Sequence, residues 1–405
     1  MVITDPLSSS SYSLSSSSSS VEPQDFSRAH YVNRKLGRGV NFGNAFDAEC
    51  RPGCGNGCNF VCTSFPLTNA LTAPERGSGG WDACWGNPIR DEHFNIIKAA
   101  GFESVRLPVR WAEKASDTPP YTIPPAFMAS VKATVDKAIA AGFPVVLNMH
   151  HFNELYDQCT PSRGDLARQT EKFVELWRQI ADEFKNYSDD YLVFEILNEP
   201  RGKVTRYYND ELLAKAWPVI RETNPNRTLM INPWEYGHYT ALPRPAIPNR
   251  DPNVILSGHY YLPQNFTHQG ESGNPIAACT MHWGTEAERQ TLKDDIERVY
   301  NTLKSKYVNS GTGGETIPIN IGEFGVTRLV PEEAERAAWL ALAVEEFEKR
   351  GFSWHYWAFP NGGNYDGYCY GINNNTIAGC PADIGCSSVG WKQNILNALI
   401  PQEVP

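Results

Sequence analysis

Short apolar runs alternate with longer segments of helical period along the chain after residue 25. The apolar runs are rich in β-branched residues, and this order predicts parallel strands joined by crossover helices. Three helix-like segments end in Gly-Phe directly before an apolar run, at 101–102, 142–143 and 351–352. Because Gly is the usual residue just past a helix end, each pair predicts a helix stop followed by a strand.

Eight apolar runs are predicted to be strands, which is the number that closes a (β/α)₈ barrel. They are Gly39 to Asn44, Ser104 to Val109, Val145 to His150, Leu192 to Asn198, Thr228 to Pro233, Val254 to Tyr261, Ile317 to Glu323 and Ser353 to Phe359. Their continuous apolar character fits strands that are covered on both faces. A doubly wound open sheet is the alternative, but no Gly-x-Gly-x-x-Gly or phosphate loop follows any run. We therefore predict an α/β protein with a TIM barrel as a single domain over residues 26–405.

The N-terminal segment differs in composition from the rest of the chain. Ser8 to Ser20 is nearly all serine, which cannot bury a core and is typical of a flexible linker. Met1 to Leu7 lacks the charged start and apolar run of a signal peptide, and no stretch approaches the roughly 18 apolar residues of a membrane helix. We expect residues 1–25 to be the remnant of a linker that once followed a signal and a further module, and hence expect a secreted protein without a membrane partner.

Charge and cysteine content indicate which binding partners and which cellular compartment to expect. The chain has 36 Lys and Arg against 46 Asp and Glu, with no basic run among aromatics, so nucleic acid is not an expected partner. Ten cysteines favour an oxidising compartment. Cys50, Cys54, Cys58 and Cys62 lack the long loop that separates ligand pairs in zinc motifs, so we expect disulfides and no metal. The disulfides are predicted to brace long loops after the strands, including Asp47 to Pro88.

Polar and aromatic residues interrupt most of the apolar runs near their C-terminal ends. In a barrel these ends form one rim, so residues far apart in sequence converge there. One buried Arg or His is a weak signal, because such residues are often satisfied structurally, but six runs agree. The residues are Arg106, His150, His151, Asn198, Glu199, His259, Tyr261, Glu323 and Trp357.

Two of these rim residues, Glu199 and Glu323, are carboxylates on different strands. Glycoside hydrolysis uses such a pair, about 5 Å apart for retention and roughly 6.5 to 9.5 Å apart for inversion. We assign Glu199 as the acid/base because it follows Asn198, whose amide could bind a sugar 2-hydroxyl. Glu323 would be the nucleophile. Arg106 and Tyr261 are expected to donate hydrogen bonds to it and to lower its pKa.

The ordered set resembles the active site of glycoside hydrolase family 5. Leu197-Asn198-Glu199-Pro200 matches the Asn-Glu-Pro signature of that family, and the likeness runs from about Arg38 to Phe359. Eight positions match the recurrent active-site positions of the family in order: Arg106, His150, Asn198, Glu199, His259, Tyr261, Glu323 and Trp357. The resemblance implies a retaining barrel in which the two histidines line the catalytic subsite and Trp357 stacks under a sugar ring. The segment from Phe266 to Gly270 is also similar to a loop of bacterial cellulases.

Other residues near the rim have two interpretations each. Trp81, Trp85, Trp111, Trp234 and Trp283 are weighed equally as sugar platforms and as core packing. Glu195 lies four residues before Glu199 on the same strand, so alternation predicts that both point into the barrel. A buried carboxylate must be paired, and our hypothesis is that Glu195 supports Arg106 or another rim donor rather than reacting.

These features predict a secreted, endo-acting β-1,4-glucanase that works by double displacement without a metal or organic cofactor. Endo action follows from the resemblance alone, and we expect a monomer that binds cellulose, carboxymethylcellulose or mixed-linkage β-glucan. The loop from Asp47 to Pro88 and the tail after Pro360 depart from the simple family pattern and leave the glycan open. A β-mannanase or a xyloglucanase would use the same pair. A barrel that binds carbohydrate without catalysis is the alternative from another class.

Overall fold

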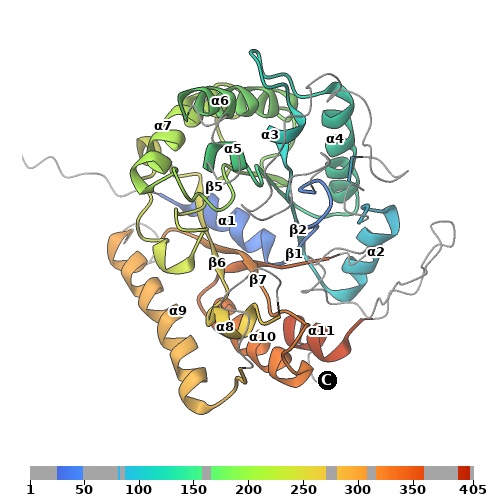
Figure 1. Cartoon of the computed structure of the whole chain (residues 1–405), viewed down its shortest axis with the longest axis vertical. Coiled ribbons are helices and arrows are strands. Elements are labelled where there is room, and N and C mark those ends of the chain that lie inside the picture. The colour runs from blue at the N-terminus through green and yellow to red at the C-terminus, as the bar shows by residue number, and fades with distance from the viewer. Residues whose placement is uncertain are drawn as a thin grey trace, which may run out of the picture.

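The structure, a computed structural model, describes residues 25–48, 81–82, 87–156, 166–270, 281–307, 316–359 and 391–401. Within these residues, eight parallel strands close a barrel in sequence order (Figure 1). The strands are β1 (Arg38–Asn41), β2 (Ser104–Leu107), β3 (Val145–Asn148), β4 (Leu192–Glu195), β5 (Leu229–Ile231), β6 (Val254–Tyr260), β7 (Ile319–Phe324) and β8 (Ser353–Tyr356). The predicted (β/α)₈ barrel is therefore confirmed, although six of the strands end two or three residues before the predicted boundary.

Helices surround the barrel, with α6 and α7 on one side and α9 and α10 on the other (Figure 1). The helices are α1 (Ser27–Leu36), α2 (Asp91–Ala100), α3 (Trp111–Lys114), α4 (Pro125–Ala140), α5 (Asn153–Tyr156), α6 (Leu166–Glu183), α7 (Arg206–Thr223), α8 (Gln264–Thr267), α9 (Glu286–Lys306), α10 (Glu333–Glu348) and α11 (Gln393–Leu399). Two 3₁₀ turns, η1 (Tyr239–Ala241) and η2 (Pro248–Arg250), lie between β5 and β6.

The three Gly-Phe pairs end helices as predicted. Gly101, Gly142 and Gly351 have φ of 98°, 86° and 72°, the left-handed region that a residue without Cβ enters at little cost. The amide of each following Phe donates to a carbonyl five residues earlier, for example Phe102 to Ile97 at 3.1 Å. This pairing satisfies a carbonyl that the helix end would otherwise leave free, and it leads the chain directly into the next strand.

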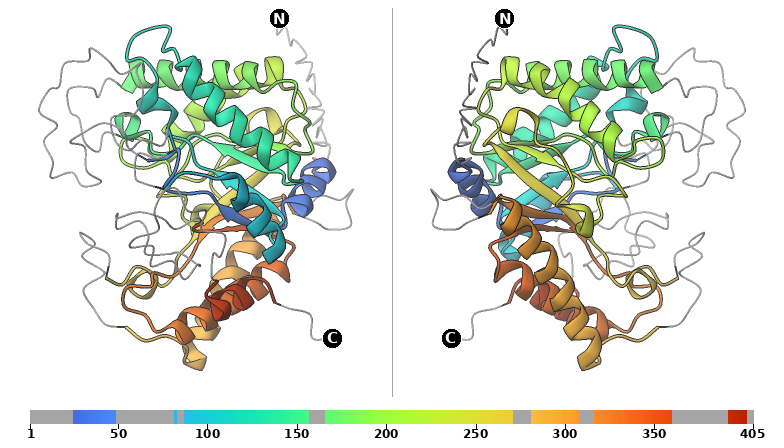
Figure 2. Two further views of the ribbon diagram at one scale, coloured as in Figure 1. Left: turned by 90° about the vertical axis from the view of Figure 1, so that its right-hand side faces the viewer. Right: turned by 90° about the vertical axis from the view of Figure 1, so that its left-hand side faces the viewer.

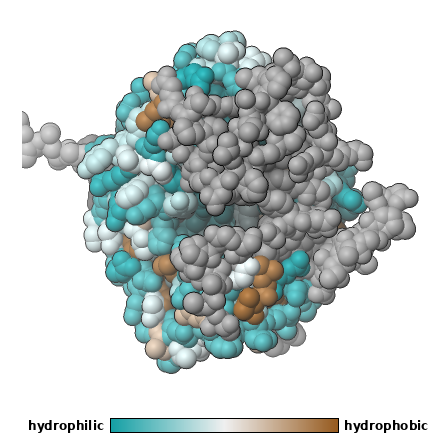
Figure 3. All heavy atoms as spheres, viewed as in Figure 1, coloured by the Kyte–Doolittle hydropathy of each residue, from teal (hydrophilic) through white to brown (hydrophobic). Residues whose placement is uncertain are grey.

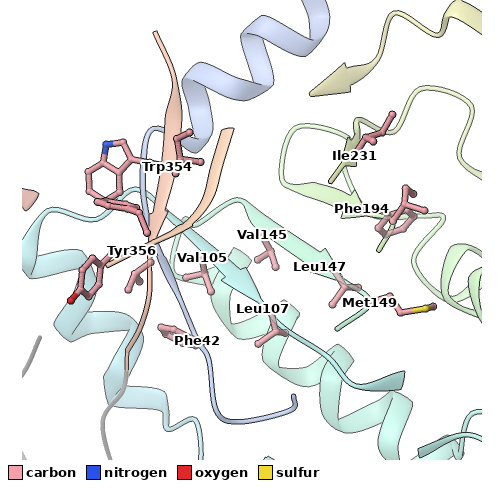
Figure 4. Packing of buried hydrophobic residues seen from close by; sticks show 14 of the residues in the cluster. Phe42, Val105, Leu107, Val145, Leu147, Met149, Phe194, Ile231, Trp354 and Tyr356 are labelled. Carbon is pink, nitrogen blue, oxygen red and sulfur yellow. The ribbon is translucent and has the colours of Figure 1, made fainter. Parts of the chain in front are cut away.

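The apolar core has two layers because strand side chains alternate between the two faces of the barrel wall. Outward residues such as Val105, Leu107, Val145 and Leu147 pack in the large outer cluster, part of which Figure 4 shows. A smaller cluster inside the barrel joins α1 to inward strand residues. Its members are Ala29, Val32, Leu36, Val146, Val193, Met230 and Ile255. Helix α1 therefore closes one end of the barrel, as Figure 2 shows, and the functional groups are confined to the other end.

The inward positions become polar toward the C-terminal ends of the strands. Directly beyond the apolar cluster, along the same inward face, come Asn148, Glu195, Asn232 and Ser257. Each of these side chains is buried. Buried polar groups need hydrogen-bond partners, and these have them: Asn232 donates to Glu195, Asn148 contacts His150, and Ser257 donates to Asn320. These hydrogen-bonded side chains lie directly beneath the rim residues.

A β-bulge in β7 reverses the direction of one rim side chain. The β6–β7 register pairs Gly258 with Ile321 but His259 with Glu323, so Gly322 is the extra residue. Simple alternation after Ile321, whose side chain packs in the outer core, would place Gly322 inward and Glu323 outward. The bulge restores an inward direction to Glu323. The sequence pattern predicted a regular strand here and missed this device.

All ten cysteines lie outside the described residues, as do residues 1–24 and most of the loop from Asp47 to Pro88. The disulfide bracing and the linker therefore stay predictions. On the face seen in Figure 3, the described surface is mostly hydrophilic with a few apolar spots. Among the described helices, none has both the length and the apolar character that a membrane crossing requires.

The bulge predicts a specific cost for a side chain at position 322. An added Cβ in Gly322→Ala would lie 2.6 Å from Ser257 Oγ. We expect the variant to lose about 2 kcal/mol of unfolding free energy, within the range for overpacked cores, in denaturant titrations followed by circular dichroism. The double variant with Ser257→Ala removes the clashing oxygen and should be more stable than the sum of the single effects. Strict additivity would show that this contact does not determine the cost.

Candidate active site

The structure brings the eight predicted site residues to the C-terminal end of the barrel. They come from strands or from the residues just beyond them: β2 for Arg106, the segment after β3 for His150, the segment after β4 for Asn198 and Glu199, β6 for His259, the residue after β6 for Tyr261, β7 for Glu323, and the segment after β8 for Trp357. All are buried except Glu199, Tyr261 and Trp357, which are partly exposed. A solvent-accessible edge on a buried polar base is the arrangement expected for a binding site.

Arg106 is the centre of the buried base. Its side chain is 0% exposed. Its Nε and Nη2 atoms donate to the two carboxylate oxygens of Glu195 at 2.6 and 2.8 Å. Nη1 donates to Glu323 Oε1 and to Asn41 Oδ1, both at 2.8 Å, and Nη2 donates to Asn198 Oδ1 at 2.6 Å. One guanidinium therefore fixes the relative positions of a carboxylate and an amide from two distant strands.

Glu195 pairs with Arg106, as the sequence analysis proposed. Its Oε1 also accepts a hydrogen bond from Asn232 Nδ2 at 2.8 Å. The prediction that strand alternation also directs Glu199 is wrong, because β4 ends at Glu195. A different backbone feature directs Glu199.

Glu199 has a left-handed backbone with φ of 47°. This region is uncommon for residues with a side chain and is found at functional sites where the surroundings enforce it. The Glu199 amide donates to Asn232 Oδ1 at 3.3 Å. Its carboxylate lies 3.0 Å from His259 Nδ1 through Oε1 and accepts from Arg201 Nη1 at 3.2 Å through Oε2. Neither Asn232 nor Arg201 was predicted as a site residue.

Glu323 faces Glu199 across His259. Tyr261 donates its hydroxyl proton to Glu323 Oε2 at 3.3 Å, and His259 Nδ1 lies 3.6 Å from the same oxygen. One oxygen of each glutamate and one ring nitrogen of His259 lie within 4.8 Å of one another. An approach this close is in keeping with the carboxylate separation of about 5 Å in retaining glycosidases.

The two glutamates have opposite pKa shifts in this substrate-free site. Burial opposes ionisation of Glu199, but the hydrogen bond from His259 and the charges of His259 and Arg201 lower its pKa to about 2. Burial raises the pKa of Glu323 and outweighs the opposing charges of His259 and Arg106. Arg106 lowers the Glu323 pKa as expected, but the net shift is upward. The physical reasons are the burial of Glu323 and the neighbouring negative charge of Glu199.

His259 lies between the two carboxylates, and both of them favour its protonated form. Its burial favours the neutral ring, but the charge of Glu323 and the hydrogen bond and charge of Glu199 raise its pKa above the usual value. Its Nε2 is buried and has no hydrogen-bond partner among the described residues. Nδ1, which faces both carboxylates, is therefore the ring nitrogen that can donate a proton within the site.

Trp357 is held flat against His150. The two rings are parallel within 4°, with centroids 5.9 Å apart. A Cβ at Gly43 would lie 2.7 Å from the indole, so only glycine leaves room for the ring there. Asn148 Nδ2 lies 3.1 Å from His150 Nδ1, and burial keeps the pKa of His150 well below its usual value. The neutral ring accepts at Nδ1 and therefore presents an N–H donor at Nε2.

The remaining tryptophans divide between the core and the rim. Trp111 and Trp283 are buried in the core cluster, and Trp81 packs against it, so the packing interpretation holds for these three. Trp234 is half-buried, and its indole nitrogen has no hydrogen-bond partner among the described residues. It remains a candidate platform. Trp85 lies outside the described residues.

Two groups of described side chains bring potential metal ligands within 4.8 Å of one another. One consists of Asp47, His150 and His151, and the other of His259 and the two glutamates. In the first, the amide of Asn148 occupies His150 Nδ1. In the second, guanidinium groups already contact both carboxylates. Neither arrangement suits a divalent cation, because an amide donor or a positive charge occupies the position of a ligand.

Comparison with known proteins adds independent findings. The family model described as cellulase, glycosyl hydrolase family 5, matches residues 67–363. Endoglucanase H of Acetivibrio thermocellus is 33% identical over 291 residues, which cover 72% of this chain but 29% of that protein. Endoglucanase A of Clostridium longisporum is 28% identical, and the match covers 95% of this chain and 70% of that protein. The chain thus spans less than a third of Endoglucanase H.

Solved structures resemble the whole barrel. Thermotoga maritima Cel5A in complex with cellobiose has a TM-score of 0.73 and 32% identity, and the match covers 92% of this chain and all of that one. The same enzyme in complex with mannotriose has a TM-score of 0.72 at the same identity and coverage.

The Arg106 pair predicts a large stability effect at Glu195. Glu195→Gln removes one charge from a fully buried ion pair, and breaking such a pair costs roughly 3 to 5 kcal/mol. We expect denaturant titration to show a loss of about 3 kcal/mol in unfolding free energy. Glu211→Gln is the matched control, since its pair with Lys215 is half exposed and should contribute at most about 1 kcal/mol. Equal effects in the two variants would refute the importance of the buried pair.

Proposed function

This chain belongs to glycosyl hydrolase family 5, and from that premise we propose that it is an endo-acting β-1,4-glucanase with a retaining mechanism. The observation that carries the proposal is the approach of one Glu199 oxygen and one Glu323 oxygen within 4.8 Å, from the segment after β4 and from β7. That distance leaves no room for a water between the carboxylate and the sugar, as inversion would need, and suits direct attack by one carboxylate.

In the first step, a Glu323 oxygen attacks the anomeric carbon while Glu199 gives a proton to the departing glycosidic oxygen. The carbon–oxygen bond of the glycan breaks and a glycosyl ester forms on Glu323. Arg106 and Tyr261 fix the orientation of the Glu323 carboxylate, because each donates a hydrogen bond to one of its oxygens, at 2.8 and 3.3 Å. A fixed nucleophile lowers the entropic cost of reaching the transition state.

In the second step, Glu199 takes a proton from water, and the water oxygen attacks the same carbon and releases Glu323. Two inversions give net retention. Glu199 must therefore hold a proton first and lose it afterwards. In the free protein both carboxylates favour the protonated form of His259, whose Nδ1 lies 3.0 Å from Glu199 Oε1. A bound glycan excludes water from Glu199 and raises its pKa, which draws the proton onto the carboxylate.

Two donors are available to orient the sugar. Asn198 Nδ2 is buried without a hydrogen-bond partner among the described residues, while its Oδ1 is fixed by Arg106. Leaving such a donor unpaired is costly, so a sugar hydroxyl that accepts from it gains correspondingly. His150 offers a second N–H beside the Trp357 ring, whose flat face suits a pyranose.

Glucan is the glycan that the relatives favour, since several are named endoglucanases. Two other names keep alternatives open. Cel5A has been solved with mannotriose, and a xyloglucan-specific endo-β-1,4-glucanase of Bacteroides ovatus is 27% identical over 71% of this chain. A barrel that binds carbohydrate without catalysis is less well supported, because binding alone does not require Glu199 and Glu323 to lie together beside His259. We also propose that the protein acts outside the cell as a monomer, with the ten cysteines as support for an oxidising compartment.

Reducing-end release from four polysaccharides tests the proposal. The substrates are carboxymethylcellulose, barley β-glucan, xyloglucan and galactomannan. We expect cleavage of the first two, with a rapid fall in viscosity that marks internal cuts. Glu199→Gln and Glu323→Gln should each lower the rate by at least about a thousandfold, because each removes a group needed in both steps.

The Glu211→Gln variant serves as the control and should keep the parental rate, since that residue lies half exposed on α7. Binding of polysaccharide without any cleavage would overturn the enzymatic proposal. Cleavage of galactomannan or xyloglucan alone would replace the proposed glycan and leave the catalytic pair intact.

A further inference from the structure

Arg201 lies beside the proposed acid/base, on the segment between β4 and α7. Its side chain is 8% exposed, so the charge is nearly removed from water. The guanidinium lies 4.5 Å from the ring centroid of Tyr156 and 5.2 Å from that of Tyr236. Tyr156 is buried and donates its hydroxyl proton to the backbone oxygen of Asn198. Cation–π contacts on two rings hold the guanidinium in place.

One nitrogen of Arg201 holds both the backbone and the side chain of Glu199. Nη1 donates to the Glu199 carbonyl oxygen at 3.1 Å and to Oε2 at 3.2 Å. Glu199 has the left-handed φ of 47°, which is unfavourable for a residue with a Cβ. Arg201 therefore stabilises an unfavourable backbone and fixes the direction of the carboxylate that the backbone carries.

The contact also carries charge. A cation in a nearly dry site favours the ionised form of a neighbouring carboxylate. The charge of Arg201 also acts on two groups near Glu199, His151 and Tyr156. Several groups face Glu199 from the elements around it. They are His259 from β6, Glu323 from β7, His151 after β3, Tyr156 from α5 and His268 after α8.

We propose that Arg201 is a positioning residue that favours the base form of Glu199 and so accelerates the second step, release of the sugar from Glu323. The proposal rests on the proposed function. The first step needs Glu199 protonated, and the second needs it ionised. A permanent positive charge cannot favour the protonated and the ionised form of Glu199 equally. The contact of Arg201 with Oε2 favours the ionised form and therefore the second step. Arg201 is one of the charges that lower the pKa of Glu199, so its removal raises that pKa.

Two substrates separate the two steps. With 2,4-dinitrophenyl β-cellobioside the leaving group departs without a proton, so release from Glu323 limits kcat and requires ionised Glu199. With cellotetraose, kcat/KM reports the first step, which requires protonated Glu199. In Arg201→Met the acidic limb of kcat for the aryl glycoside and the alkaline limb of kcat/KM for cellotetraose should both move up by about one pH unit. At a pH below the limb, kcat for the aryl glycoside should fall about tenfold.

Arg201→Lys keeps the charge but loses the flat stacking surface and should recover part of both shifts. Arg178→Met, at a half-exposed surface arginine, is the matched control and should leave both limbs in place. Circular dichroism would establish that each variant is folded.

Unmoved limbs, or an equal loss of rate on both substrates at every pH, would overturn the proposal and leave Arg201 a structural residue. Failure of the proposed function is distinguishable, because the unsubstituted protein would then turn over neither substrate.

Discussion

The buried guanidinium of Arg106 is the interaction on which the active end of the barrel depends. It contacts Glu195, Glu323 and Asn198 at 2.6 to 2.8 Å with no exposure to water. Without it, Glu195 and Glu323 would lose the positive charge that both contact. The Asn198 amide would lose the hydrogen bond that fixes its orientation. Because Arg106 projects from the middle of a strand, the rigidity of the sheet is transferred to the reacting groups. The loops can then vary without disturbing the chemistry.

The two glutamates reach one another by different backbone devices, and this difference separates their surroundings. A bulge at Gly322 turns Glu323 inward onto Arg106 and Tyr261, whereas a left-handed residue turns Glu199 toward His259 and Arg201. Glu323 is the more deeply buried of the two, and Glu199 is closer to positive charge. In the substrate-free site the two carboxyl groups have pKa shifts of opposite sign. The proposed acid and nucleophile roles require substrate binding to raise the pKa of Glu199 and to lower that of Glu323. His259 lies between them, and both carboxylates favour its protonated form.

Local pattern was sufficient for the barrel and for the eight rim residues, because apolar runs, Gly-Phe helix stops and misplaced polar residues are all visible in the chain. It was not sufficient where the outcome depends on neighbours distant in sequence. The bulge at Gly322 follows from pairing with β6, and the raised pKa of Glu323 follows from burial and from the charge of Glu199. Arg201 resembled an ordinary charged residue after the Asn-Glu-Pro motif until its contacts with Glu199 were seen. The same limit applies to Trp111 and Trp283, whose burial in the core no periodicity revealed.

Covalent trapping tests the central claim, that Glu323 is the nucleophile and Glu199 the acid/base, most directly. A 2-deoxy-2-fluoro-β-cellobioside with a dinitrophenyl leaving group slows release of the glycosyl ester more than its formation. Peptide mass spectrometry after proteolysis would then locate the attached sugar. The account predicts one fluorocellobiosyl group per protein, on the peptide that contains Glu323. Attachment to Glu199, or turnover with inverted configuration and no attachment, would contradict it.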